Sequence, residues 1–128
     1  PIYGDGKQIR DWLYVEDHAR AINKIINKGK VGEKYNIGAR NSIENIMLVK
    51  KICNILDELY PIKDNPHVDN SLDSYADLIT YITDRPGHDI HYAINPSKIE
   101  KELDWKPLES FEKGLEKTIK WYIKENKN

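Results

Sequence analysis

The sequence predicts an α/β fold in which short strands alternate with amphipathic helices. Two observations support it: apolar residues switch repeatedly from strand-like clusters to helical spacing, and Gly, Pro or Asn stands at most of the switches. The chain has 128 residues, 39% of them hydrophobic and 32% charged, which suits one globular domain. We therefore expect a single α/β domain over residues 1–128.

The first half of the chain begins this alternation. Arg10–Val15 is rich in aromatic and β-branched residues and predicts a strand. Apolar residues then recur at helical spacing over Glu16–Gly29, where the glycine ends the predicted helix. A second strand is expected at Lys34–Gly38. After it, Ser42 is expected to cap a helix that Pro61 ends.

The second half repeats the pattern after an interruption. Lys63–Ser74 is polar and rich in turn residues, so we expect a mobile surface excursion with no assigned role. Strands are predicted at Leu78–Thr83 and His91–Ile94. A helix is expected to start at Asn95–Pro96, and the last helix at Ser110.

Charge and cysteine content exclude several classes of function. The 20 basic and 21 acidic residues are interspersed, which disfavours nucleic-acid and membrane-surface partners. No apolar run reaches membrane-spanning length. Cys53 is the only cysteine, so an internal disulfide and a multi-cysteine zinc site are excluded, and we expect a cytoplasmic protein. The chain starts at Pro1 without a methionine, which favours a fragment.

Common catalytic constellations are missing from the sequence. The serines lack the glycine elbow of a hydrolase nucleophile, and Cys53 lies in an apolar helical stripe, typical of a buried filler. Gly4 and Gly6 are too few for a dinucleotide fingerprint and lead toward a strand. The histidines, which show no metal-ligand spacing, are His18, His67, His88 and His91. We assign no catalytic residue and no metal site.

One turn is stiff by composition and carries ligand-binding side chains. Pro86 fixes its own φ and pushes Arg85 toward an extended conformation, while Gly87 can adopt angles closed to other residues. Arg85 offers a planar fork suited to phosphate, and His88 adds a donor whose charge can change near neutral pH. The alternative is a surface loop in which Arg85 pairs with a flanking aspartate, Asp84 or Asp89.

Three other residues could complete a site for an anion. Arg10 enters the first predicted strand, and Asn45 lies in the first turn of a helix whose unpaired amides favour phosphate. Tyr3 could supply a flat face for a base. If the fold gathers these segments, they form a pocket for a nucleoside diphosphate.

Three motifs occur together in this chain: "RDWLYVEDHARA" at residues 10–21, "YNIG" at 35–38, and "DRPGHD" at 84–89 with a following "YAI". In this combination the chain resembles the C-terminal part of the dTDP-glucose 4,6-dehydratases, a family of the extended short-chain dehydrogenase/reductase superfamily. The resemblance implies that residues 1–128 are the C-terminal substrate-binding portion of a Rossmann-type, NAD(P)-binding enzyme. Its N-terminal NAD-binding domain would be absent from the chain.

The resemblance also implies a site for a dTDP-sugar. Tyr3 would pack on thymine, and Arg10 would bind the diphosphate. The implied substrate-binding residues are Pro1, Ile2, Tyr3, Arg10, Asn45, Asp84, Arg85, Pro86, Gly87 and His88. The full-length enzyme would be a homodimeric lyase that converts dTDP-glucose to dTDP-4-keto-6-deoxyglucose with NAD. The isolated fragment would be inactive.

The chain departs from the family pattern at three positions. Ile90 and His91 stand where two basic residues are common, and Asn95 stands where Asp is common. Three alternatives stay open. The chain could belong to a related nucleotide-sugar enzyme such as UDP-glucuronate decarboxylase, to another sugar dehydratase or epimerase, or to a non-catalytic domain that binds nucleotide sugars.

Overall fold

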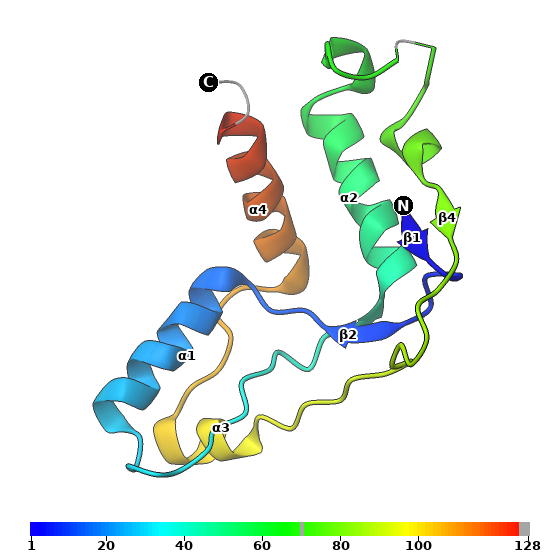
Figure 1. Cartoon of the computed structure of the whole chain (residues 1–128). Coiled ribbons are helices and arrows are strands. Elements are labelled where there is room, and N and C mark those ends of the chain that lie inside the picture. Colours follow the sequence, from blue (N-terminus) through cyan, green and yellow to red (C-terminus); the bar gives the residue numbers. More distant parts are fainter. Residues whose placement is uncertain (70, 126–128) are drawn as a thin grey trace.

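The computed structural model describes residues 1–69 and 71–125, and it confirms the α/β class. Its elements in chain order are β1 (Ile2–Tyr3), β2 (Ile9–Asp11), α1 (Val15–Lys28), β3 (Ser42–Glu44), α2 (Asn45–Leu59), the 3-10 turns η1 (Ile62–Asp64) and η2 (Tyr75–Leu78), β4 (Tyr81–Ile82), α3 (Ser97–Leu103) and α4 (Phe111–Glu125). Figure 1 shows the helices joined by long extended segments, with β2 running between the α1–α3 side and the α2–β1–β4 side. Among the described residues, no helix is both long and apolar enough to cross a bilayer.

Short strand pairs connect distant parts of the chain. β1 runs parallel to β4, with Ile2 opposite Tyr81, and β2 runs antiparallel to β3, with Arg10 opposite Ile43. A single parallel bridge joins β2 to His91. The first eleven residues are therefore bonded to the start of α2 and to both sides of the 84–89 turn.

Two separate clusters of buried side chains form the core. The first lies between α1 and α3 and consists of Ala21, Ile99, Leu103 and Trp105. The second lies under α2 and the 3-10 turns and consists of Cys53, Ile62 and Tyr75. Cys53 is buried, as its place in an apolar stripe predicted.

The predicted strands are shorter than expected or do not form. The strand predicted at Arg10–Val15 ends at Asp11, because β3 offers only three partner residues and α1 begins at Val15. Lys34–Gly38 is not a strand, since no described segment forms a ladder with it. The strand at Leu78–Thr83 is limited to β4, and that at His91–Ile94 to a single bridge. A strand needs a partner for its backbone groups, and sequence pattern does not supply one.

The helices follow their sequence signals more closely. α1 ends at Gly29, whose N–H donates to the Ile25 carbonyl (2.8 Å). α3 and α4 start within two residues of the predicted positions, and the Ser110 hydroxyl accepts from Lys113 N–H (3.3 Å). The capping role predicted for Ser42 is wrong: Ser42 belongs to β3, and the α2 N-cap residue is Glu44.

The described part of Lys63–Ser74 packs on α2 instead of forming a loose excursion. The Asp57 carboxylate on α2 accepts from the Ser74 hydroxyl (2.6 Å) and from Tyr75 N–H (3.0 Å). Tyr75 is buried, and its hydroxyl accepts from the Asn65 amide (3.2 Å). Asp57 thereby fixes the start of η2, which leads along the chain to β4 and then to the 84–89 turn.

Candidate functional site

Strand pairing places the 84–89 turn beside β1 and β2. Gly4 N–H donates to the Ile82 carbonyl (2.9 Å) just before the turn, and Ile9 N–H donates to the Ile90 carbonyl (2.8 Å) just after it. Both ends of the turn are thus fixed to the N-terminal segment. This geometry brings together side chains that are more than seventy positions apart, including those of Arg10 and His88.

Arg10 is the centre of this site. Its guanidinium donates through Nη2 to His88 Nε2 (3.0 Å) and to the Asp89 carbonyl (2.9 Å), and through Nη1 to the Ile9 carbonyl (2.7 Å). Its Cζ atom lies 4.3 Å from the centre of the Tyr92 ring, a cation–π contact. Hydrogen bonds therefore hold the guanidinium at its edges, and the Tyr92 ring covers one of its faces.

The hydrogen bonds of His88 fix its tautomer. A guanidinium can only donate, so His88 Nε2 accepts from Arg10 and carries no hydrogen. The hydrogen is then on Nδ1, which donates to Asp84 Oδ1 (2.7 Å). The His88 side chain is only 9% exposed. His88 is thus a neutral, oriented imidazole that links a cation to a carboxylate.

The Asp84 carboxylate gathers three donors. Oδ1 accepts from His88 and from Arg85 N–H (2.8 Å), and Oδ2 accepts from Gln8 Nε2 (2.8 Å). Burial raises the pKa of Asp84, but the hydrogen bonds from His88 and the Arg85 amide outweigh it and hold this pKa below its ordinary value. Gly4 makes room for the group: a Cβ there would lie 3.1 Å from Asp84 Oδ2, and its φ is +57°.

Arg85, Pro86 and Gly87 are consecutive exposed residues of the turn. Gly87 has φ +70°, the left-handed conformation that the sequence predicted for a glycine at this point. The Arg85 guanidinium makes no hydrogen bond or ion pair within residues 1–69 and 71–125. The surface pair considered as an alternative does not form, because Asp84 is bonded to His88 and Asp89 accepts from the Tyr92 hydroxyl.

The start of α2 differs from the sequence prediction. Asn45 N–H donates to the Gln8 carbonyl (3.0 Å) and Ile46 N–H to the Gly6 carbonyl (2.9 Å). The first two amides of the helix are therefore bonded, and the expectation that they are free for phosphate is wrong. The 6–8 turn supplies the carbonyls that cap the helix. Asn45 still adjoins the site through Gln8, and its own Oδ1 is buried without a donor.

The three N-terminal residues differ in accessibility. Pro1 is exposed, whereas Ile2 is 8% exposed and its backbone belongs to the β1–β4 pair. Tyr3 is 49% exposed, and its ring meets the His88 ring edge to face with centres 6.3 Å apart. Of these three side chains, Tyr3 is the one in ring contact with the Arg10–His88–Asp84 group.

Three residues of the site were not found from the sequence. Gln8 donates to Asp84, Tyr92 covers Arg10, and Asp89 accepts from Arg10 through its backbone. A polar amide in a turn gives no sequence signal. Tyr92 does lie four residues after the "DRPGH" stretch, and an aromatic residue so close to predicted cations was a usable signal.

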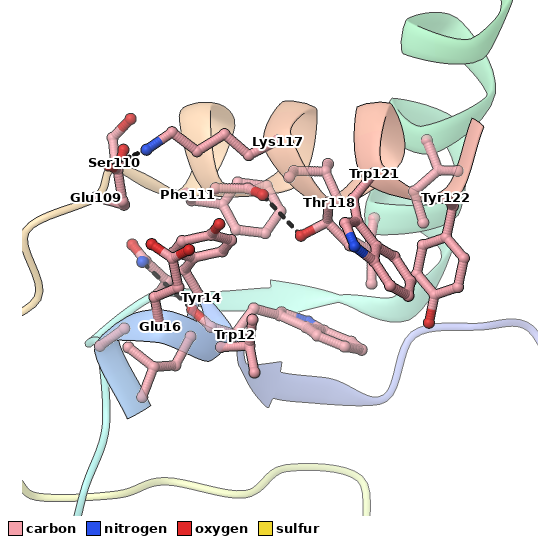
Figure 2. Close-up of a pocket in the computed structure, with 18 residues that line it drawn as sticks. Trp12, Tyr14, Glu16, Glu109, Ser110, Phe111, Lys117, Thr118, Trp121 and Tyr122 are labelled. Carbon is pink, nitrogen blue, oxygen red and sulfur yellow. Dashed lines mark hydrogen bonds and ion pairs between the residues drawn. The ribbon is translucent and has the colours of Figure 1, made fainter. Parts of the chain in front are cut away.

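A cavity lies elsewhere in the described residues. It is an apolar groove of about 670 Å³ between α4 on one side and the segment from the end of β2 to the start of α1 on the other. Figure 2 shows Trp12, Tyr14, Phe111, Trp121 and Tyr122 around it. None of the predicted site residues lines this groove. The described residues also contain no group of three or more His, Cys, Asp or Glu side chains suited to a metal ion.

The chain matches the family model described as GDP-mannose 4,6 dehydratase over residues 1–118. It therefore belongs to that family, and the resemblance of its motifs to the dTDP-glucose 4,6-dehydratases is confirmed by relatives of that name. The dTDP-glucose 4,6-dehydratases of Escherichia coli and of Neisseria meningitidis serogroup B are 55% and 54% identical to it over 123 residues, 96% of this chain. The chain spans 33% of the length of each of these relatives.

Solved structures share the fold. The crystal structure of dTDP-glucose 4,6-dehydratase from Bacillus anthracis in complex with NAD matches with a TM-score of 0.77 and 42% identity, over 99% of this chain and 35% of that one. A UDP-glucose 4-epimerase from Thermotoga maritima, solved with UDP-glucose, matches with a TM-score of 0.72 and 28% identity, over 97% of this chain and 34% of that one.

Proposed function

We propose that this chain is the nucleotide-sugar-binding part of a dTDP-glucose 4,6-dehydratase, a lyase that forms dTDP-4-keto-6-deoxyglucose. The observation that carries the proposal is the Arg10–His88–Asp84 group beside the exposed Tyr3 ring and the unpaired Arg85 guanidinium. Cations held next to a flat aromatic face suit a nucleoside diphosphate. The names of the two relatives described above supply the substrate, dTDP-glucose.

Each residue has a distinct role in this proposal. A guanidinium has five N–H donors, and Arg10 uses three of them within the protein, so two are left for diphosphate oxygens. Arg85 has its whole side-chain fork available, so it makes the stronger contact. Tyr3 stacks on thymine, and Asn45 contributes its amide from the start of α2. Pro86 and Gly87 set the shape of the turn that presents Arg85.

Cofactor chemistry belongs to residues outside this site. Gly4 and Gly6 bracket a turn that leads into β2, whereas a dinucleotide requires a glycine-rich turn from a strand into a helix. The described residues therefore do not fit NAD, which we assign to the remaining length seen in the relatives. We expect no turnover of dTDP-glucose by the 128-residue chain alone. Residues 1–128 are thus proposed as a binding domain that holds the substrate for catalytic groups located elsewhere.

The test is a calorimetric titration of dTDP into the complete polypeptide that carries these residues. If Arg85 binds a diphosphate oxygen, Arg85→Ala loses a charge-assisted hydrogen bond, about 1.5–3 kcal/mol, and affinity falls at least about tenfold. Arg85→Lys keeps the charge without the planar fork and regains part of the affinity. Arg40→Ala is the matched control, because Arg40 pairs with Glu100 away from the site. Equal dissociation constants for all four proteins would remove Arg85 from the site.

A related enzyme for uridine nucleotides is the second candidate. The epimerase that shares this fold was solved with UDP-glucose, and a tyrosine face stacks on either pyrimidine. Titration of UDP in place of dTDP distinguishes the two: tighter binding of UDP would favour the second candidate. The wild-type protein serves for both titrations.

The proposal extends to the setting of the complete enzyme. The single, buried thiol of Cys53 suits a reducing compartment, and we propose the cytoplasm. On the resemblance to its family, we propose a homodimer. Sedimentation of the complete polypeptide tests the dimer, and a monomeric species at micromolar concentration would exclude it.

A further inference from the structure

Gln8 is a buried side chain with one end bonded and the other not. It is 7% exposed, and its Nε2 donates to Asp84 Oδ2 (2.8 Å). Its Oε1 is fully enclosed and has no hydrogen-bond donor among the described residues. A buried acceptor without a donor destabilises a protein, so packing alone does not explain a glutamine at this position.

The bonded end of Gln8 controls the orientation of the Asp84 carboxylate. With Oδ2 fixed by Gln8, Oδ1 is turned toward the His88 ring and accepts its Nδ1–H. The ring then presents Nε2 to Arg10 Nη2 at 3.0 Å. Three consecutive hydrogen bonds thus connect the buried Gln8 amide to the Arg10 guanidinium.

We propose that Gln8 is a positioning residue for the nucleotide-sugar site, acting on Arg10 through Asp84 and His88. This inference rests on the function proposed above and adds to it a residue that does not itself contact the ligand. Without Gln8, the Asp84 carboxylate is held through Oδ1 alone, by His88 and by Arg85 N–H, and its plane can twist about the Cβ–Cγ bond. His88 then loses its fixed ring orientation, and Arg10 loses the acceptor that directs it.

The unpaired Oε1 gives this proposal a distinctive consequence. Methionine has nearly the shape of glutamine and no oxygen, so Gln8→Met removes the enclosed acceptor together with the bond to Asp84. Water can replace the lost donor at Asp84, whose side chain is 35% exposed, so we expect stability not to fall while the site becomes looser. A residue with a purely structural role would show the opposite: a lower melting temperature and unchanged ligand affinity. Residues kept for function are expected to break a local stability rule in this way.

The experiment compares dTDP affinity and melting temperature in the complete polypeptide. For Gln8→Met we expect affinity to fall about fivefold or more while the melting temperature does not fall. Gln8→Glu places two carboxylates together and also weakens binding. The double variant Gln8→Glu/Asp84→Asn restores an amide–carboxylate bond between the two positions and recovers part of the affinity.

Asn65→Leu is the matched control. Asn65 also donates through its side-chain amide, to the Tyr75 hydroxyl in the second core cluster, and none of its hydrogen bonds joins the site. We expect this variant to lower the melting temperature and to leave dTDP affinity unchanged. Unchanged affinity in Gln8→Met would overturn the proposal, and so would an affinity loss matched by the drop in melting temperature seen for Asn65→Leu.

A separate measurement tests the role of Gln8 if the proposed function is wrong. If the wild-type protein does not bind dTDP, the function is wrong, and the role of Gln8 is then read from the His88 ring by nitrogen NMR. The wild-type ring should show hydrogen on Nδ1 alone. A mixture of tautomers in Gln8→Met supports the proposal, and identical ring shifts in the two proteins overturn it.

Discussion

The polar site around Arg10 and the apolar groove beside α4 differ in how their side chains are held and in what they can bind. Aromatic and aliphatic side chains line most of the groove. The Arg10 site is polar, its groups are fixed by hydrogen bonds, and it carries an unpaired arginine on a stiff turn. A diphosphate requires directed donors, so the chemistry of a surface identifies its ligand better than its volume does.

A carboxylate organises each of these two regions. At the site, Asp84 holds the His88 ring and the Gln8 amide. Near the groove, Asp17 on α1 is 2% exposed and accepts from Arg20 Nη2 (2.6 Å). It also accepts from the amides of Leu108 and Glu109, both at 3.1 Å. Asp17 thereby fastens the start of α1 to the segment that leads into α4.

The largest effect is expected from breaking the Asp17 contact. Asp17→Ala leaves Arg20 and two backbone amides without their acceptor, and we expect a loss of about 3 kcal/mol in the free energy of unfolding. Urea denaturation of the complete polypeptide measures it. Affinity for dTDP should persist wherever the variant is folded, because Asp17 has no bond to the Arg10 site. A loss below about 1 kcal/mol in the free energy of unfolding would show that the hydrogen bonds of Asp17 contribute little to stability.

The same carboxylate predicts how stability depends on pH. Burial raises the pKa of Asp17, but the hydrogen bonds from Arg20 and the two amides outweigh it and lower this pKa below its ordinary value. Because the folded pKa is the lower one, the stabilisation is complete above the unfolded pKa of about 3.9 and is lost as pH falls through the folded pKa. Asp17→Asn should remove this part of the acid dependence. An unchanged slope of stability below about pH 4 in Asp17→Asn contradicts the assignment.

A smaller effect is expected from uncovering Arg10. Tyr92→Leu removes the aromatic face that lies 4.3 Å from the guanidinium, and we expect dTDP affinity to fall about threefold to tenfold. Tyr92→Phe keeps the face and loses only the bond to Asp89, so its affinity should stay closer to wild type. Calorimetric titration of both variants checks the order. Equal losses of dTDP affinity in Tyr92→Leu and Tyr92→Phe would assign the effect to the Tyr92 hydroxyl instead of its ring.

Sequence signals predicted what is local in this molecule and missed what depends on distant partners. Gly29 and Ser110 mark helix ends because their capping bonds lie within four residues. Lys34–Gly38 has a strand-like composition, but no described segment pairs with it. The shape of the Gly87 turn followed from its own residues. The Gln8–Asp84 bond spans 76 positions, and nothing in either residue type announces it.

The smallest effect on nucleotide binding should come from the groove. Trp121 on α4 lines it and is 56% exposed, yet the groove shares no residue with the Arg10 site. Trp121→Gln should therefore leave the dissociation constant for dTDP within about twofold of wild type, since distant sites act independently. In the isolated 128-residue chain, the exposed apolar surface favours self-association, and the same substitution should reduce it. Sedimentation of the isolated chain and titration of the complete polypeptide measure the two effects separately. A large loss of dTDP affinity in Trp121→Gln would mean that the groove takes part in the nucleotide site, and the distinction between the two surfaces would then be wrong.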